Sequence, residues 1–170
     1  MRALGKSIVG VILLLASMHA SAVIIPWTVA LDGGQEVPSV VTAASGTGFG
    51  SVDTVTSTLY WAISASGFIS SVDAAHFHEA PIGVNGAVQV DLASGTVVNG
   101  GGFVQYFGMA VLTLSQLSAM LDGNFYVNIH TSDHPSGEIR GQVRRVPEPG
   151  TLGLLSAGLI ALLLLRKRVA

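Results

Sequence analysis

The sequence contains no cysteine and, between residues 23 and 145, no lysine. The absence of cysteine excludes disulfides, thiolate metal ligands and cysteine nucleophiles. Charge of either sign is scarce, since Asp, Glu, Lys and Arg make up only 11% of the 170 residues. Residues 23–145 hold three arginines against nine carboxylates, a formal net charge of −6. Such a surface repels a phosphate backbone, so we expect no nucleic-acid partner.

Two of the remaining basic residues belong to an N-terminal leader. Arg2 and Lys6 precede an apolar run at 8–16, and small residues follow at 20–22. This order is typical of a secretory signal peptide. The apolar run is also shorter than the about 20 residues of a membrane span. We therefore predict a signal peptide at residues 1–22, cleaved after Ala22 by signal peptidase.

The segment 146–170 has the pattern of a membrane-inserted tail. Pro147, Glu148 and Pro149 interrupt regular structure because proline has no backbone N–H. Residues 150–165 are almost wholly apolar, and the basic residues 166–168 follow them. Snorkelling of these cations extends the reach of the run, which predicts a single transmembrane helix at about 150–165. Terminal cations stay in the cytoplasm, so the domain at 23–145 is expected outside.

These three parts resemble a known sorting signal. A Pro147-Glu148-Pro149 motif, an apolar helix and a terminal basic cluster follow one another as in a PEP-CTERM segment. The resemblance implies a Gram-negative bacterium and processing of an inner-membrane-anchored precursor by an exosortase. It further implies release to the cell surface or the extracellular polysaccharide matrix. A permanent membrane anchor has the same topology and is the alternative.

The region 23–145 has the size of one domain and the pattern of a β protein. Glycines and small polar residues divide it about every ten residues, which suits short strands and turns. Alternation is clearest at 58–66, where large apolar residues occupy every second position. We predict an all-β fold, a Greek-key β-sandwich or flattened barrel. The predicted strands are 27–31, 48–52, 58–66, 72–78, 87–92, 103–107, 109–114, 125–130 and 138–143.

One short helix and one irregular segment interrupt this pattern. Leu117, Met120 and Leu121 have helical spacing and predict a helix over 115–121. Ser115 is its expected N-cap, and Asp122-Gly123 its expected end. The segment 39–58 is rich in serine, threonine and glycine, and we predict an irregular edge or loop there.

Four of the five histidines lie in this domain. Strand alternation puts His76 and His78 on one face of a strand, and His130 on the polar face of another. Histidines at i and i+2 of a strand have backbones about 6.5 Å apart, so their rings can converge on one ion. Neutral imidazole suits copper or zinc. If the two strands are neighbours, His76, His78 and His130 form a candidate metal site, with Glu79, His134 or Glu138 nearby.

A polar network is the competing interpretation, and the one that the sequence alone favours. The polar residues of these faces can hydrogen-bond to one another without an ion; they are His76, His78, Asn128, His130, Glu138 and Arg140. Only two candidate ligands have a relative geometry fixed by the sequence, whereas metal sites need three or more. His134 precedes Pro135 and is expected in a turn. No complete catalytic constellation is apparent, so we expect no enzyme activity.

Three separated motifs resemble those of the CHRD (chordin) domain. They are LDGGQEVP at 31–38, AHFH at 75–78 with GVNG at 83–86, and YVNIHT at 126–131 with PSGEIRGQ at 135–142. The resemblance covers about 31–143 and implies an extracellular β-rich module. In animals this module is part of a growth-factor antagonist, and in bacteria its biochemical role is mostly unassigned. Phe77 replaces an aliphatic residue of the family, and Ser39 a common proline.

A weaker similarity is to copper/zinc superoxide dismutases, which carry H-x-H on a strand of a Greek-key barrel. In them a late histidine is followed by an arginine, and His76, His78, His130 and Arg140 have a comparable order. The bridging histidine, the zinc-loop ligands and the cysteine pair of that family are missing here. We therefore expect no dismutase activity, while a reduced single-metal site stays open.

The function favoured by the sequence is an exported, non-enzymatic binding or structural module at the cell surface or in the extracellular matrix. Extracellular polysaccharide and surface proteins are the candidate partners, with Tyr60 and Tyr126 as aromatic rings that can stack on sugars. The alternative is a secreted copper- or zinc-binding protein that uses His76, His78 and His130.

Overall fold

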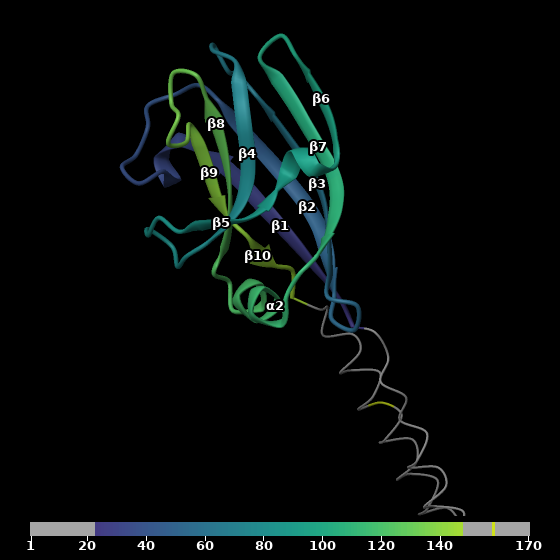
Figure 1. The fold of residues 1–170 in the computed structure, drawn as a ribbon. Helices are drawn as coiled ribbons and strands as arrows, with labels where there is room; N and C mark the ends of the chain where they lie inside the picture. Colours follow the sequence, from purple (N-terminus) through teal and green to yellow (C-terminus); the bar gives the residue numbers. More distant parts are fainter. Residues whose placement is uncertain (1–22, 148–157, 159–170) are drawn as a thin grey trace, which may run out of the picture.

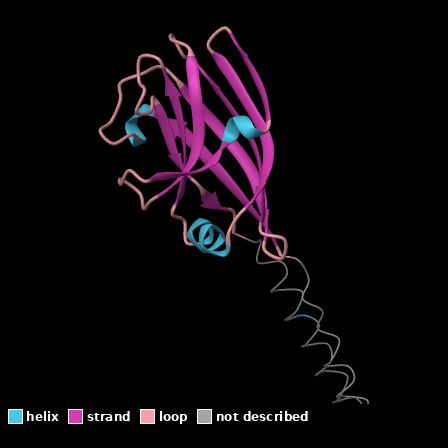
Figure 2. Ribbon diagram, viewed as in Figure 1, coloured by secondary structure: helices cyan, strands magenta, loops and turns pink. Residues whose placement is uncertain are grey.

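The computed structural model describes residues 23–147 and 158. This part of the chain is all-β with one short α-helix, as predicted (Figure 2). The helical elements are η1 (Gly33–Gln35), η2 (Leu92–Ser94), both 3-10, and α2 (Leu114–Leu121). The strands are β1 (Ile24–Asp32), β2 (Ser45–Asp53), β3 (Thr58–Ser66), β4 (Val72–Glu79), β5 (Ala87–Asp91), β6 (Thr96–Gly100), β7 (Phe103–Val111), β8 (Phe125–Thr131), β9 (Ile139–Gln142) and β10 (Arg144–Arg145).

All these strands belong to one antiparallel sheet in the order β5-β4-β8-β9-β1-β2-β3-β7-β6, with β10 pairing with β1. The sheet curls so that β4 and β8 lie across from β1, β2 and β3 (Figure 1). β5 and β6, the two end strands of this order, do not pair with each other, so the curled sheet of the described residues forms a half-barrel. The pairs β1–β9, β3–β7 and β4–β8 join strands distant in sequence, as Greek-key connections do.

The core fills the inside of the curl and centres on Phe77 of β4. Its ring makes edge-to-face contacts with Trp27 of β1 and Trp61 of β3, with ring centroids 5.8 Å apart in each case. All three side chains are buried. Since the tryptophans and Phe77 come from opposite halves of the curled sheet, these contacts hold the two halves together.

The prediction of an irregular edge or loop holds for 39–44 and 54–57 but is wrong for 45–53, where β2 is a central strand that contains the predicted strand 48–52. It pairs along its whole length with β1 on one side and β3 on the other. A Cβ atom at Gly50 would collide with the ring of Trp27 and the carbonyl of Tyr60. The absence of a side chain at Gly50 therefore makes room for close packing of the core.

The sequence prediction divides one observed strand into two and omits two other strands. Residues 103–107 and 109–114, predicted as separate strands, lie largely in β7, and Leu114 begins the helix. β6 and β10 were not predicted. Gly101 and Gly102 join β6 to β7 with φ of 62° and 77°, as a type I′ hairpin turn requires.

The N-cap of helix α2 is Thr113, two residues before the predicted N-cap Ser115. Thr113 Oγ1 accepts from the backbone N–H of Gln116 (3.3 Å), and Gln116 Oε1 accepts from the N–H of Thr113 (2.8 Å). This capping box replaces the predicted cap at Ser115. Leu117 and Met120 are buried as predicted, and Gly123 with φ of 79° follows the C-cap Asp122.

Val23 and Pro147 line the same surface groove. The predicted signal peptide with Ala22, the motif residues Glu148 and Pro149, and the basic residues 166–168 lie outside the described residues. So does the predicted helix at 150–165, apart from Gly158. In the part of the chain that the structure describes, the helices are too short or too polar to cross a bilayer.

Candidate metal centre

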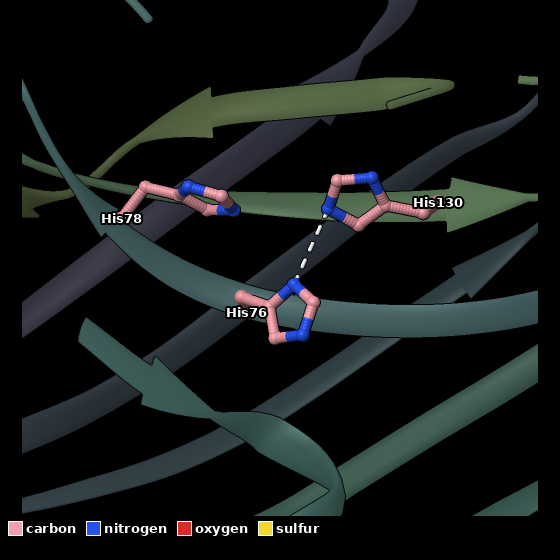
Figure 3. A group of neighbouring side chains, drawn as sticks. All are labelled: His76, His78 and His130. Atoms are coloured by element: carbon pink, nitrogen blue, oxygen red, sulfur yellow. Dashed lines mark hydrogen bonds between the residues drawn. The ribbon is translucent and has the colours of Figure 1, made fainter. Parts of the chain in front are cut away.

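His76, His78 and His130 come together on adjacent strands. β4 pairs antiparallel with β8, with His76 opposite Asn128 and Ala74 opposite His130, so His130 is diagonal to His76. The other face of β4 carries Ala75 and Phe77 in the core. Alternation therefore places the histidines as predicted, and Figure 3 shows their rings around one small space.

The spacing of the three rings suits one ion. A nitrogen of each ring lies within 4.8 Å of the others, and Nδ1 of His76 is 3.3 Å from Nε2 of His130. Nitrogens bound to one tetrahedral ion at about 2.1 Å are about 3.4 Å apart, so modest side-chain rotation completes the geometry. In the absence of an ion, the 3.3 Å contact is a hydrogen bond when His76 Nδ1 carries the proton.

Backbone carbonyls fix the tautomers of two histidines. Nδ1 of His78 lies 3.0 Å from the carbonyl oxygen of Gly86, and Nδ1 of His130 lies 3.0 Å from that of Pro135. A carbonyl only accepts, so each Nδ1 carries hydrogen and each Nε2 offers a lone pair. Nε2 of His78 is buried and has no hydrogen-bond partner among the described residues. Metal-binding histidines are commonly oriented by such bonds.

Both of these histidines favour the neutral form that binds metal. Burial lowers the pKa of His78, opposed by its bond to Gly86 and assisted by the neighbouring histidines and Arg140. Burial likewise lowers the pKa of His130, opposed by its bond to Pro135 and assisted by His76.

An arginine and a tyrosine form a stack next to His78. The rings of His78 and Tyr126 are stacked with centroids 5.0 Å apart, and the guanidinium carbon of Arg140 lies 3.5 Å from the Tyr126 centroid. Arg140 is only 2% exposed and donates to Asn85 Oδ1 (3.1 Å) and to the carbonyl of Val84 (2.8 Å). The stack therefore anchors the loop that carries Gly86, and with it the tautomer of His78.

The polar face of β8 and β9 is buried, which the sequence did not indicate. Glu138 accepts from the hydroxyls of Thr42 and Thr131, at 2.6 Å each. Glu79, His134 and Glu138, expected near the site, do not join the group of three histidines in the described part of the chain. His134 instead lies in a turn, as predicted, and its carbonyl accepts from the N–H of Gly137.

Sequence reasoning also missed Glu36. It is 7% exposed, and burial raises the pKa of its carboxyl group to about 7, against an opposing effect of Arg140. Its Oε1 and the Oδ1 of Asn128 both face Gly137, and neither has a hydrogen-bond partner among the described residues. Only its place in the motif at 31–38 singles this residue out in the sequence.

Comparison with known proteins gives two matches to family models. The model described as "CHRD domain" matches residues 27–143, and the model described as "PEP-CTERM protein-sorting motif" matches residues 145–168. No curated protein and no solved structure matches the chain. The three clustered histidines, Tyr126 and Arg140 all lie inside the first match.

Proposed function

The chain belongs to the CHRD domain family, and we propose that this member is a non-enzymatic binding module that acts at the cell surface or in the extracellular matrix. Its PEP-CTERM motif implies an exported protein of a Gram-negative bacterium that is processed at the membrane by an exosortase. We further propose that signal peptidase cleaves after Ala22 and that a helix at 150–165 holds the precursor in the inner membrane.

The ligand that the geometry supports best is a transition metal ion, either copper or zinc. The observation that carries this proposal is the group of three imidazoles, whose nitrogens lie within 4.8 Å of one another. A polar network alone leaves the buried Nε2 of His78 unpaired among the described residues. An unpaired buried acceptor costs about 1–3 kcal/mol. A bound ion would use that lone pair.

A non-enzymatic role is supported by how the polar groups are engaged. Glu138 accepts two hydroxyl hydrogen bonds, which occupy both of its oxygens. Arg140 is buried and bonded to the loop at 84–85, so it is not free to guide an anion to the site as a dismutase arginine would. We therefore do not include dismutase activity in the proposed function.

Extracellular polysaccharide and surface proteins remain proposed partners with less support. Tyr60 is 43% exposed on β3, whereas Tyr126 is buried in the stack with Arg140. Only the first of these two aromatic rings is therefore accessible for stacking on a sugar.

Metal content of the purified full chain tests the metal proposal. After equilibration with copper or zinc and removal of free ion, elemental analysis should find one ion per chain. The double variant His76→Ala/His78→Ala should lose it, because two of three ligands are gone. His134→Ala is the matched control and should retain the ion. Equal metal content in the double variant and the wild type would refute the site.

A further inference from the structure

We infer that the ion selected by the site of His76, His78 and His130 is monovalent copper, Cu(I), in preference to divalent zinc. The inference rests on the proposed function, since it names the ion for the same three ligands. Three features of the described residues carry it: the charge of the ligand set, the position of Arg140 and the number of ligands.

The ligand set is uncharged. All three donors are imidazole nitrogens, and within the described residues no carboxylate belongs to the group. Asp91 lies opposite His76 on β5, but its Oδ1 accepts the backbone N–H of Ala93 (2.8 Å) at the start of η2. A divalent ion would bring two uncompensated charges to this partly buried place, and a monovalent ion only one. The cost of burying ionic charge rises steeply with its magnitude.

A positive charge is already fixed beside the site. The guanidinium of Arg140 stacks on Tyr126, which stacks on His78. Arg140 is buried, where its charge is weakly screened by water. Its repulsion of a bound ion is proportional to the charge of that ion, so a divalent ion is repelled about twice as strongly as a monovalent one.

The number of ligands also favours monovalent copper over zinc. Zinc in proteins is almost always four-coordinate, and with three protein ligands it needs a water or substrate as the fourth. Monovalent copper is stable with two or three nitrogen donors and needs no further ligand. Nε2 of His78, which would face the ion, is shielded from solvent. The cluster therefore provides a full set for Cu(I) and an incomplete one for zinc.

Competition titration of the purified full chain in detergent tests the inference. Under anaerobic conditions, Cu(I) is offered from its complex with bathocuproine disulfonate, and Zn(II) in parallel from a zinc-responsive chelator. We expect one equivalent of Cu(I), bound about 100-fold tighter than Zn(II) because of its smaller charge. X-ray absorption of the copper-loaded chain should show three nitrogen neighbours.

The variants separate this site from adventitious binding. His76→Ala and His76→Gln should each weaken Cu(I) binding by more than the about 10–100-fold that loss of a supporting partner causes. His134→Ala should leave it unchanged. His76 is only partly buried, so both variants should fold, which near-ultraviolet circular dichroism of Trp27 and Trp61 checks.

Each other outcome has a definite meaning. One equivalent of zinc bound by the three histidines, with weaker Cu(I), would overturn the inference and leave the proposed metal-binding function standing. Failure to bind either ion would overturn both. Equal Cu(I) affinity of the His76 variants and His134→Ala would overturn the assignment of copper to this site.

Discussion

Glu36 is a carboxyl group placed where its negative charge is poorly solvated. Burial raises its pKa to about 7 from the ordinary value of 4.5, although the nearby Arg140 opposes the shift. The folded chain therefore holds a proton that the unfolded chain releases between these two values. The contribution of Glu36 to the free energy of unfolding consequently falls as pH rises from about 4.5 to 7.

Glu36→Gln should remove this pH dependence. We expect the variant to match the wild type near pH 4.5 and to be more stable at pH 8, by up to about 3 kcal/mol. Urea denaturation at both pH values measures the difference. The exposed Asp133→Asn should show no such gain.

The histidines contribute with the opposite sign in an overlapping window. The pKa values of His78 and His130 are lowered from 6.5, so their contribution to stability is present above that pH and is lost as pH falls. Both the wild type and Glu36→Gln contain His78 and His130, so the contribution of these histidines cancels when the free energies of unfolding of the two proteins are subtracted. A gain of the same size at pH 4.5 and pH 8 would contradict the titration of Glu36.

The strand faces on which the three histidines lie can be predicted from the sequence, but the convergence of their rings cannot. Alternation in 74–78 and 126–130 places His76, His78 and His130 opposite core residues, as the structure confirms. Their convergence requires β4 to pair with β8, two segments about fifty residues apart that no periodicity links. The carbonyls of Gly86 and Pro135 belong to loops, where side-chain patterns carry no information about hydrogen bonding.

At the scale of elements, predictions succeeded where burial alternates and failed where it does not. The range of β3 was predicted to the residue, because large core side chains occupy every second position. β6 is exposed at every position and has no alternation to detect. Only 48–52 of β2 is predicted as a strand, because its glycines fit against large neighbours such as Trp27, and the sequence alone does not distinguish a glycine in a loop from one in a tightly packed strand.

The cap of α2 offers a direct test at this scale. Thr113→Ala removes the hydroxyl that accepts from Gln116 and should lower the free energy of unfolding by about 1 kcal/mol. Ser115→Ala, at the cap expected from the sequence, should change it by less than about 0.5 kcal/mol. Thermal or urea denaturation compares the two. A larger loss for Ser115→Ala would show that the helix begins later than in the structure.

For the whole molecule, cohesion depends on contacts across the curl of the sheet. Phe77→Ala should cost about 3–5 kcal/mol, since it empties a fully buried site between Trp27 and Trp61. Phe107→Ala is the matched control, because Phe107 is an exposed residue of β7, and it should cost less than about 1 kcal/mol.

Chemical denaturation followed by tryptophan fluorescence measures both variants. We expect a single transition in each case, because the two halves belong to one continuous sheet and share one core. Two separate transitions in Phe77→Ala would show that the halves fold independently. A similar loss in both variants would show that Phe77 has no special bridging role.

The tail leaves the domain from β10, which pairs with β1 in the middle of the sheet. Any pull transmitted through Pro147 therefore reaches the two residues of β10 first and then β1, a strand with neighbours on both sides. A pull on the tail would thus be borne by the middle of the sheet before it reached the outer strands β5 and β6.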